Sequence, residues 1–453
     1  MSDEVLHVGC AAGFSGDRTD AASTVVDALL ASGGPAFLVF ETLAERTLAL
    51  AQLARRSDPS AGYEPLLAEM LGPVLGRCLE GNVRIVGNFG AANPRGAAQR
   101  IFSLCRELGL RAPRISVVAG DDLSGPEQRA LLHEALGESV DPTSLVSANA
   151  YIGGHSIADA ITAGAEIVVC GRIADPSLVV GPALAHFGWA RDDWTRLGRA
   201  TMVGHLLECG AQVTGGYYAD PGYKDVPNIA TLGYPIAEIR NDGQCTITKP
   251  PGTGGRVDVH TVTEQLLYEL HDPAAYLTPD VVADITEVVL EADGIDRVKV
   301  NGVRGHPATG TLKVIVCAEQ GWLSEGEISY AGRRAEGRAR LAADILRHRL
   351  ASAGATLRVD LIGVASVLGD DGGRWLAAKP AGEASDVRLR VAMRHADRSV
   401  AERLAREVTA LYTCGPAGGG GVRTSIRRRL STRSCLVPRE AVPTRFDMVR
   451  ADA

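Results

Sequence analysis

The stretch VRIVGNFGAANPRGAAQRIFSLCRELGLRAPRISVVAG, residues 83–120, contains a complete strand, helix and strand. Two short apolar runs stand at its ends, and between them AAQRIFSLCRELGL repeats its apolar residues at helical spacing. The same alternation extends from the N-terminus to about residue 190. Strands that alternate with helices of this length predict βα units around a parallel sheet. The six expected strands are residues 5–9, 36–41, 83–88, 114–120, 145–151 and 166–171.

Polar and glycine-rich residues follow each expected strand. The six exits read CAAGFSGDR, ETLAERT, NFGAANPRG, GDDLSG, NAYIGGH and GRIADPS. Both open α/β sheets and β/α barrels place their active sites at the carboxyl ends of their strands, so these exits predict the position of the site. Only six strand–helix units are clear, which leaves both an open sheet and a barrel as alternatives, and we favour an open Rossmann-like sheet.

The pattern changes after about residue 280. There, ITEVVLEADGIDRVKVNG predicts a β-hairpin, TLKVIVCA a strand, EISYAGRRAEGRARLAADILRHRL a helix, TLRVDLIGV and VRLRVAMRH two strands, and SVAERLAREVTALYT a second helix. This order predicts an α+β, ferredoxin-like sandwich. The expected domains are an α/β parallel-sheet domain at 1–240, a glycine-rich loop with a connecting helix at 241–285, and the smaller sandwich at 286–453.

The composition is that of a soluble globular protein, with 453 residues, 45% hydrophobic and 22% charged. A net charge of −7 argues against a broad nucleic-acid surface. The sequence contains no run of about 18 apolar residues, and MSDEVLHVGC lacks a signal-peptide pattern, so we expect a cytoplasmic protein that does not bind membranes. Nine cysteines without CxxC spacing predict reduced thiols.

Several exit residues are candidates for ligand contacts. Glu41 directly follows the apolar run FLVF, and Asn88 follows RIVG, so helix capping does not explain either position. Asp17 is a further candidate acid or base. Helix capping is the alternative interpretation for Asp17, Asp20, Asp121, Asp122, Asn93 and Asp175. The remaining exit candidates for substrate binding are Arg18, Asn93, Asn149, Arg172 and Asp175.

The segment HLLECGAQVTGGYYADPGYKDVP, residues 205–227, begins with three polar residues on one helical face. His205, Glu208 and Cys209 stand at positions i, i+3 and i+4. This spacing suits an acid/base pair with a nearby thiol, two metal ligands, or an ordinary polar helix face. Gln212 follows as a candidate substrate-binding residue.

A glycine-rich loop, KPPGTGG at residues 249–255, lies between an expected strand and an expected helix. Its backbone N–H groups, with Lys249 and Arg256 on either side, would suit a phosphate, a carboxylate or an oxyanion. A plain strand-to-helix turn is the alternative, and the spacing does not match a Walker motif. The candidate residues of this loop are Lys249, Gly252, Thr253, Gly254, Gly255 and Arg256.

Eight motifs occur in order between about residues 8 and 260: GFSGDR, LAERT, NFGAANP, ANAYIGG, GRIADPSL, GHLLECGAQVTGGY, GYPIAEI and ITKPPGTGG. Together they resemble the acyclic terpene utilisation AtuA-like family. The resemblance implies a role in the breakdown of branched isoprenoid acids as coenzyme A thioesters. Longer members add a small ferredoxin-like domain after the main body. Because this sequence ends at FDMVRADA, we expect the protein to work without that domain or with a partner that carries it.

Three functional hypotheses follow. The first is a lyase or hydratase acting on an acyl-CoA or a related carbonyl or carboxylate substrate, with His205, Glu208, Asp17 and Glu41 as candidate acids and bases. The second is a non-catalytic subunit that binds an acyl-CoA or carrier-bound intermediate within a larger complex. The third is a metal-dependent hydrolase or lyase that uses the His205 and Glu208 face, with Asp17 or Asp175, to hold a divalent metal. We also expect the chain to form a homo-oligomer.

Overall fold

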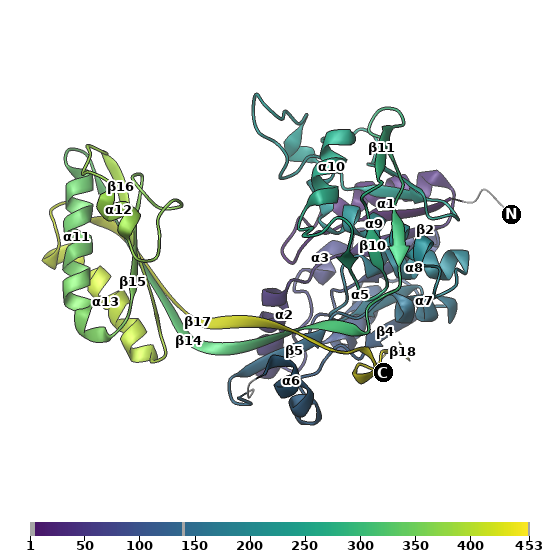
Figure 1. The fold of residues 1–453 in the computed structure, drawn as a ribbon, viewed down its shortest axis with the longest axis horizontal. Coiled ribbons are helices and arrows are strands. Elements are labelled where there is room, and N and C mark those ends of the chain that lie inside the picture. Colours follow the sequence, from purple (N-terminus) through teal and green to yellow (C-terminus); the bar gives the residue numbers. More distant parts are fainter. Residues whose placement is uncertain (1–4, 138–140, 452–453) are drawn as a thin grey trace. The chain divides into compact units, whose positions relative to one another are not determined.

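The structure is a computed structural model that describes residues 5–137 and 141–451. The first four residues of MSDEVLHVGC and the last two of FDMVRADA therefore lie outside the described residues. The chain divides into two compact units, a larger one at Met1–Cys317 with Thr432–Ala453 and a smaller one at Ala318–Ser431 (Figure 1). These divisions differ from the boundaries expected near residues 240 and 285, because the strands that follow residue 240 extend the main sheet of the larger unit.

The larger unit is built on an open ten-stranded sheet in the order β11-β12-β8-β7-β1-β2-β3-β6-β4-β18. Its centre, from β1 to β4, is parallel, and antiparallel strands extend it on both sides. The expected open α/β sheet is therefore confirmed, and no barrel closes. The strands are β1 (Leu6–Cys10), β2 (Ala36–Phe40), β3 (Arg84–Gly87), β4 (Ile115–Ala119), β6 (Ile167–Cys170), β7 (Ile236–Ile239), β8 (Cys245–Thr248), β11 (Val289–Ala292), β12 (Val298–Asn301) and β18 (Arg445–Val449).

Helices cover both faces of the parallel centre, as buried parallel strands require. Along β2, Leu38 and Phe40 pack into one hydrophobic cluster, while Val39 between them packs into the other. One cluster includes residues of α1, α3, α4 and α5, and the other includes residues of α6 to α10. The helices are α1 (Ala21–Ser32), α2 (Glu45–Ser57), α3 (Leu67–Leu71), α4 (Leu75–Glu80), α5 (Pro94–Glu107), α6 (Arg129–Leu136), α7 (His155–Thr162), α8 (Ser177–Phe187), α9 (Trp194–Glu208) and α10 (Val259–Leu267).

One expected strand lies outside this sheet. β5 (Leu145–Ala150) pairs with β14 (Thr311–Ala331) instead of joining the parallel strands. The reason is that β4 already has β6 on one side and β18, from the end of the chain, on the other. A separate three-stranded sheet in the order β13-β10-β9 completes the larger unit. Its strands are β9 (Tyr276–Leu277), β10 (Val282–Asp284) and β13 (Arg304–His306).

The smaller unit is the expected α+β sandwich. Its strands are ordered β15-β16-β14-β17, and α11 and α13 pack on one face of this sheet. Residues 327–331, expected to begin a helix, instead continue β14, because Ile328 and Tyr330 are buried at the two-residue period of a strand. β14 and β17 each continue from one unit into the other (Figure 1). The further elements are α11 (Ala335–Leu350), β15 (Leu357–Ile362), α12 (Arg374–Ala378), β16 (Asp386–His395), α13 (Arg398–Cys414) and β17 (Gly420–Pro438).

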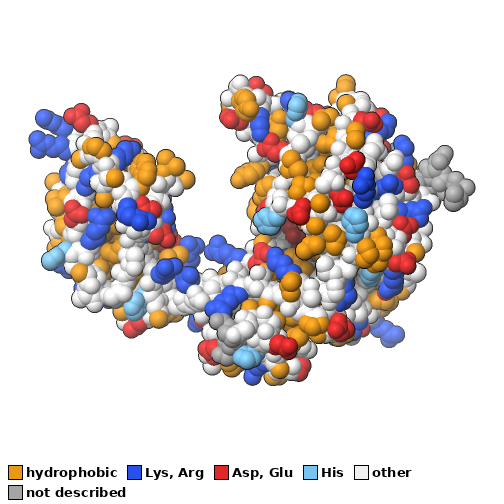
Figure 2. Space-filling model, viewed as in Figure 1, with side chains coloured by type: hydrophobic (Ala, Val, Ile, Leu, Met, Phe, Trp, Pro, Cys, Tyr) orange, Lys and Arg blue, Asp and Glu red, His pale blue; other side chains and the backbone are white. Residues whose placement is uncertain are grey.

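The surface mixes charges of both signs. On the face shown in Figure 2, Lys and Arg side chains are interspersed with Asp and Glu side chains on each unit. Within the described ranges, no helix combines the length and the apolar character that a membrane crossing would need.

Candidate functional site

A cavity of about 590 Å³ lies in the larger unit at the carboxyl ends of the parallel strands, and we call it the site cavity. Polar residues reach it from the exit of β1, the exit of β2 and the exit of β6, and from the end of α9. This is the edge at which open α/β sheets bind their ligands. The candidates that line it are Asp17, Glu41, Arg172, Asp175, Glu208, Cys209 and Gln212.

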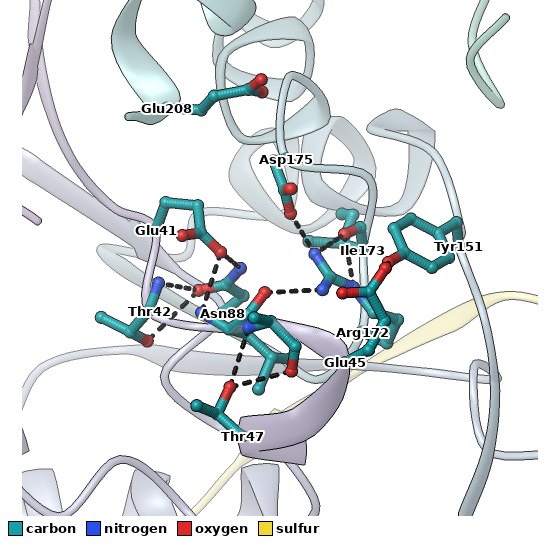
Figure 3. Close-up of polar contacts among 12 residues, drawn as sticks. Glu41, Thr42, Glu45, Thr47, Asn88, Tyr151, Arg172, Ile173, Asp175 and Glu208 are labelled. Atoms are coloured by element: carbon teal, nitrogen blue, oxygen red, sulfur yellow. Dashed lines mark hydrogen bonds and ion pairs between the residues drawn. The ribbon is translucent and has the colours of Figure 1, made fainter. Parts of the chain in front are cut away.

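Glu41 is held in place by backbone and side-chain donors. Asn88 Nδ2 and the backbone N–H of Leu43 both donate to Glu41 Oε1, each at 2.8 Å (Figure 3). Burial raises the pKa of Glu41 well above its ordinary value, and the negative charge of Asp175 adds to this rise. Asn88 is fully buried and accepts from the backbone N–H of Thr42 at 2.7 Å, so it positions Glu41 and does not line the cavity.

Arg172 is a buried cation that ties several strand exits together. Its side chain is 1% exposed and donates to the carbonyl oxygens of Leu43, at 2.6 Å, and Ile173, at 2.9 Å. It also forms an ion pair with Asp175 and lies over the ring of Tyr151, 4.4 Å from the ring centre (Figure 3). The guanidinium is thus occupied by protein groups, and its charge stabilises the carboxylates around it.

Tyr151, Glu45 and Lys313 form another side of the site cavity, which the sequence interpretation missed. The hydroxyl of Tyr151 donates to Glu45 Oε1 at 2.7 Å. Lys313 Nζ lies 3.7 Å from the same oxygen and 4.8 Å from the Tyr151 ring centre, and its side chain is half-exposed. Glu45 and Tyr151 belong to two of the strand exits. Their position after a strand could therefore have identified them as candidates. Lys313 comes from β14 and carries no local signal.

Glu208 presents an unpartnered oxygen beside the site cavity. His205 Nδ1 lies 2.9 Å from Glu208 Oε1, while Glu208 Oε2 and His205 Nε2 are buried without a hydrogen-bond partner among the described residues. His205 is only 2% exposed and does not line the cavity, so it lies behind Glu208. Gln265 Nε2 donates to the carbonyl oxygen of His205 at 3.0 Å, and the Tyr276 ring packs 5.3 Å from the imidazole.

The protonation of this pair is set by burial and by its neighbours. Burial, together with the charges of Asp175 and Glu269, raises the pKa of Glu208 to about 7, against the opposing effect of His205. Burial lowers the pKa of His205, but the hydrogen bond and charge of Glu208 outweigh this and raise it overall. The two groups therefore titrate together, and the pair retains a proton at a higher pH than an isolated glutamate would.

Asp17, Cys209 and Gln212 complete the set of candidates at the cavity. Asp17 accepts from the backbone N–H of Gly13 at 2.8 Å and from the hydroxyl of Tyr234 at 2.6 Å. Burial raises the pKa of the Cys209 thiol, so this cysteine is not a thiolate nucleophile at neutral pH. Gln212 Oε1 is buried and has no partner among the described residues, which leaves it available to a donor on a ligand.

The charge of the lining is strongly negative. Six carboxyl groups share the cavity with two cations, so mutual repulsion and burial favour the protonated state of some carboxyls. A negatively charged group on a ligand would be repelled by this lining. The carboxyls are Asp17, Glu41, Glu45, Asp175, Glu208 and Glu269, the cations are Arg172 and Lys313, and the aromatic residues are Phe14, Tyr151, Tyr217, Tyr234 and Tyr268.

The structure does not bring the glycine-rich loop to this cavity. Lys249 pairs with Asp296 at 3.1 Å and donates to the carbonyl oxygen of Thr253 at 2.9 Å. Arg256 pairs with Asp258. A Cβ at Gly254 would collide with the carbonyl oxygen of Asn228, so this glycine permits a close contact between backbones. The backbone N–H groups of residues 254, 255 and 256 donate to carbonyl oxygens, and neither they nor Gly252 line the site cavity.

Three exit candidates also lie elsewhere. Asn93 caps α5 by accepting from the backbone N–H of Gly96 at 3.0 Å. Asn149 donates to Asp121 at 2.9 Å, and both asparagines line a different cavity of about 440 Å³ in the larger unit. Arg18 pairs with Asp20 near the surface. The contacts of these three residues fit helix capping or another structural role, which was the alternative to ligand binding.

The ligand set of a metal centre is not assembled in this structure. Across residues 5–137 and 141–451, no group of three or more His, Cys, Asp and Glu side chains is arranged to hold a metal ion. The pair His205 and Glu208 therefore has no third ligand in place.

Comparison with known proteins gives one match. A family model described as acyclic terpene utilisation family protein AtuA matches residues 6–448, a range that includes every residue of the site cavity. No curated protein and no solved structure matches the chain.

Proposed function

Because the chain belongs to the acyclic terpene utilisation family AtuA, we propose that it is an enzyme that acts on a carbonyl-containing acyl substrate in the site cavity. The reaction is a lyase or hydratase reaction in which Glu208 transfers a proton. The observation that carries this proposal is the buried Oε2 atom of Glu208, which has no partner among the described residues and belongs to a cavity-lining carboxyl group whose pKa is raised to about 7. A general acid or base works best when its pKa lies near the pH at which the enzyme operates.

The neighbouring groups support proton transfer at this position. His205 holds the other oxygen of Glu208 and so fixes the direction in which Oε2 points. Glu41 lines the same cavity with its pKa raised well above the ordinary value, so it can supply a proton. In a dehydration, Glu208 would remove a proton from the carbon next to the carbonyl, and Glu41 would protonate the hydroxyl group that leaves as water.

The charge of the cavity narrows the substrate class. The lining holds six carboxyls and two cations, and Asp175 already pairs with Arg172. A free carboxylate at the reacting end would face repulsion, whereas a neutral thioester would not. Lys313, whose side chain is half-exposed, can donate to the thioester oxygen and stabilise the negative charge that develops there. An acyl thioester, such as a coenzyme A ester, therefore fits better than a free acid.

The test is turnover by the full-length chain. Short branched 3-hydroxyacyl-CoA and 2-enoyl-CoA esters are incubated separately with the protein, and mass spectrometry detects gain or loss of one water or cleavage of the chain. Conversion of either ester supports the proposal. Tight binding of both esters without any conversion would contradict it and favour a non-catalytic binding subunit.

A further inference from the structure

A second cavity, of about 320 Å³, adjoins the site cavity in the larger unit, and we call it the side cavity. Tyr151, Asp175 and Lys313 line both cavities, so the two meet at these side chains. Beyond them the lining becomes predominantly apolar. The other lining residues are Ala174, Pro176, Tyr276, Leu277, Thr278, Pro279, Thr309, Thr311, Leu312 and Leu436.

Two leucines of the side cavity are exposed. Leu277 is 64% exposed and Leu436 is 62% exposed, while Leu312, which lines the same cavity, is buried. Apolar side chains that face a concave space gain free energy when an apolar ligand covers them. The charged groups of the lining, Asp175 and Lys313, stand at its boundary with the site cavity, so the two adjoining cavities together have a charged end and a mainly apolar end.

Leu436 reaches this position because of strand geometry. Cys435 and Val437 are buried on one side of β17, so Leu436 between them points to the opposite side. The segment is fixed in place by Arg439, whose backbone N–H donates to Gly310 at 2.9 Å and whose Nε donates to Thr309 at 3.1 Å. The segment of the chain that returns from the smaller unit thus supplies one wall of the side cavity.

We propose that the side cavity binds the hydrocarbon part of the substrate and that Leu436 limits the chain length accepted. This inference rests on the proposed function, because it requires an acyl group whose carbonyl end lies in the site cavity. The occupant follows from the residues that the two cavities share: an acyl group whose carbonyl lies near Lys313 in the site cavity can extend its alkyl chain past Tyr151 toward the exposed leucines.

The test measures binding and does not require turnover. Dissociation constants of the butanoyl and octanoyl thioesters of N-acetylcysteamine, which carry a neutral head group, are measured by calorimetry on the full-length chain. Each fully buried methylene strengthens binding by about fourfold, so burial of even two of the four extra methylenes should make the octanoyl ester bind at least about tenfold more tightly. The ratio of the butanoyl to the octanoyl dissociation constant should fall to near one in Leu436→Trp and, separately, in Leu277→Trp. Leu341→Trp, at a 53% exposed leucine on α11, is the matched control and should leave the ratio unchanged.

The outcomes separate this inference from the proposed function. A ratio that falls in both cavity variants but not in the control supports the side cavity, whether or not the protein converts any ester. Equal affinity for both esters, or an unchanged ratio in both cavity variants, overturns it, even when turnover of coenzyme A esters is observed. Binding of neither ester also overturns it.

Discussion

His205 Nδ1 lies 2.9 Å from Glu208 Oε1, and this contact leaves the second oxygen of the glutamate without a partner beside the site cavity. The imidazole is buried behind the carboxyl group, so a ligand in the cavity meets Glu208 and not His205. The two residues therefore have different roles in our account. We propose Glu208 as the catalytic residue and His205 as a positioning residue that acts through it.

Glu208→Gln is expected to lower kcat by about 100-fold or more, because general acid–base groups typically contribute 10²–10⁴-fold. The substitution keeps the size of the side chain, so the folded structure should persist by circular dichroism. The measurement is steady-state turnover of the ester that the wild-type protein converts. Glu134→Gln, at an exposed position of α6, is the matched control. Equal turnover in Glu208→Gln and wild type would remove Glu208 from the mechanism.

His205→Gln should change the pH profile more than the maximal rate. Without the imidazole, Glu208 loses the hydrogen bond and the charge that lower its pKa, so burial raises this pKa further. The limb of the kcat/KM profile that reports the deprotonated carboxyl should move to higher pH. The measurement is kcat/KM between pH 5 and pH 9 for both proteins. An unshifted profile would mean that His205 does not act through Glu208.

The raised pKa of Glu208 also predicts how stability depends on pH. Its value of about 7 in the folded state exceeds the ordinary 4.5, so the folded state binds a proton more tightly than the unfolded state. This contribution to stability is present at low pH and is lost as the pH rises from about 4.5 to about 7. Glu208→Gln lacks the titrating group. Between pH 5 and pH 8, its free energy of unfolding should rise relative to wild type by on the order of 2 kcal/mol.

Urea unfolding at both pH values measures this difference, with Glu134→Gln as the control for a general loss of charge. A difference between Glu208→Gln and wild type that stays constant from pH 5 to pH 8 would contradict the raised pKa.

Asn88→Ala should reduce both stability and activity. Asn88 is fully buried, donates to Glu41 and accepts from the backbone N–H of Thr42, so its removal leaves buried groups unpaired. The expected cost is about 1–3 kcal/mol of unfolding free energy. Because Glu41 would lose its orientation, kcat should fall with little change in KM. A variant that is destabilised but turns over at the wild-type rate would show that Asn88 has only a structural role.

Lys249→Met tests whether the glycine-rich loop is structural. Lys249 is almost fully buried and pairs with Asp296, whose side chain is partly exposed. Breaking this pair should cost about 2 kcal/mol of unfolding free energy, less than for a fully buried pair. KM should not change, because the loop does not line the site cavity. A raised KM with unchanged stability would instead support an anion-binding loop.

The sequence could reveal those site residues that follow a parallel strand, because open α/β sheets bind ligands at the carboxyl ends of their strands. Glu41, Arg172 and Asp175 follow parallel strands, and the carboxyl ends of such strands lie along one edge of the sheet. Lys313 could not be found in this way, because β14 reaches the cavity only after the chain has completed the parallel sheet. A position after a strand also cannot separate a residue that faces a ligand from one that holds its neighbour, as Asn88 holds Glu41.

The sequence predicted the fold correctly where a local pattern determines the structure. The prediction failed where a strand pairs with a segment that is distant in the sequence. The alternation of strands and helices indicated the open sheet, and the second half indicated the sandwich. β5 has a strand-like sequence, but its place beside β4 is occupied by β18, which comes from the other end of the chain. The glycines of residues 252–255 indicated a close approach of the backbone, and at Gly254 the approaching group is the carbonyl of Asn228.

The central claim is that Glu208 transfers a proton at the carbon next to a thioester carbonyl. The most direct measurement is deuterium incorporation at that carbon when a saturated acyl-CoA ester is incubated in D₂O with wild-type protein and with Glu208→Gln. The account predicts protein-dependent incorporation in wild type and its loss in the variant. Incorporation at the same rate in both proteins would contradict it.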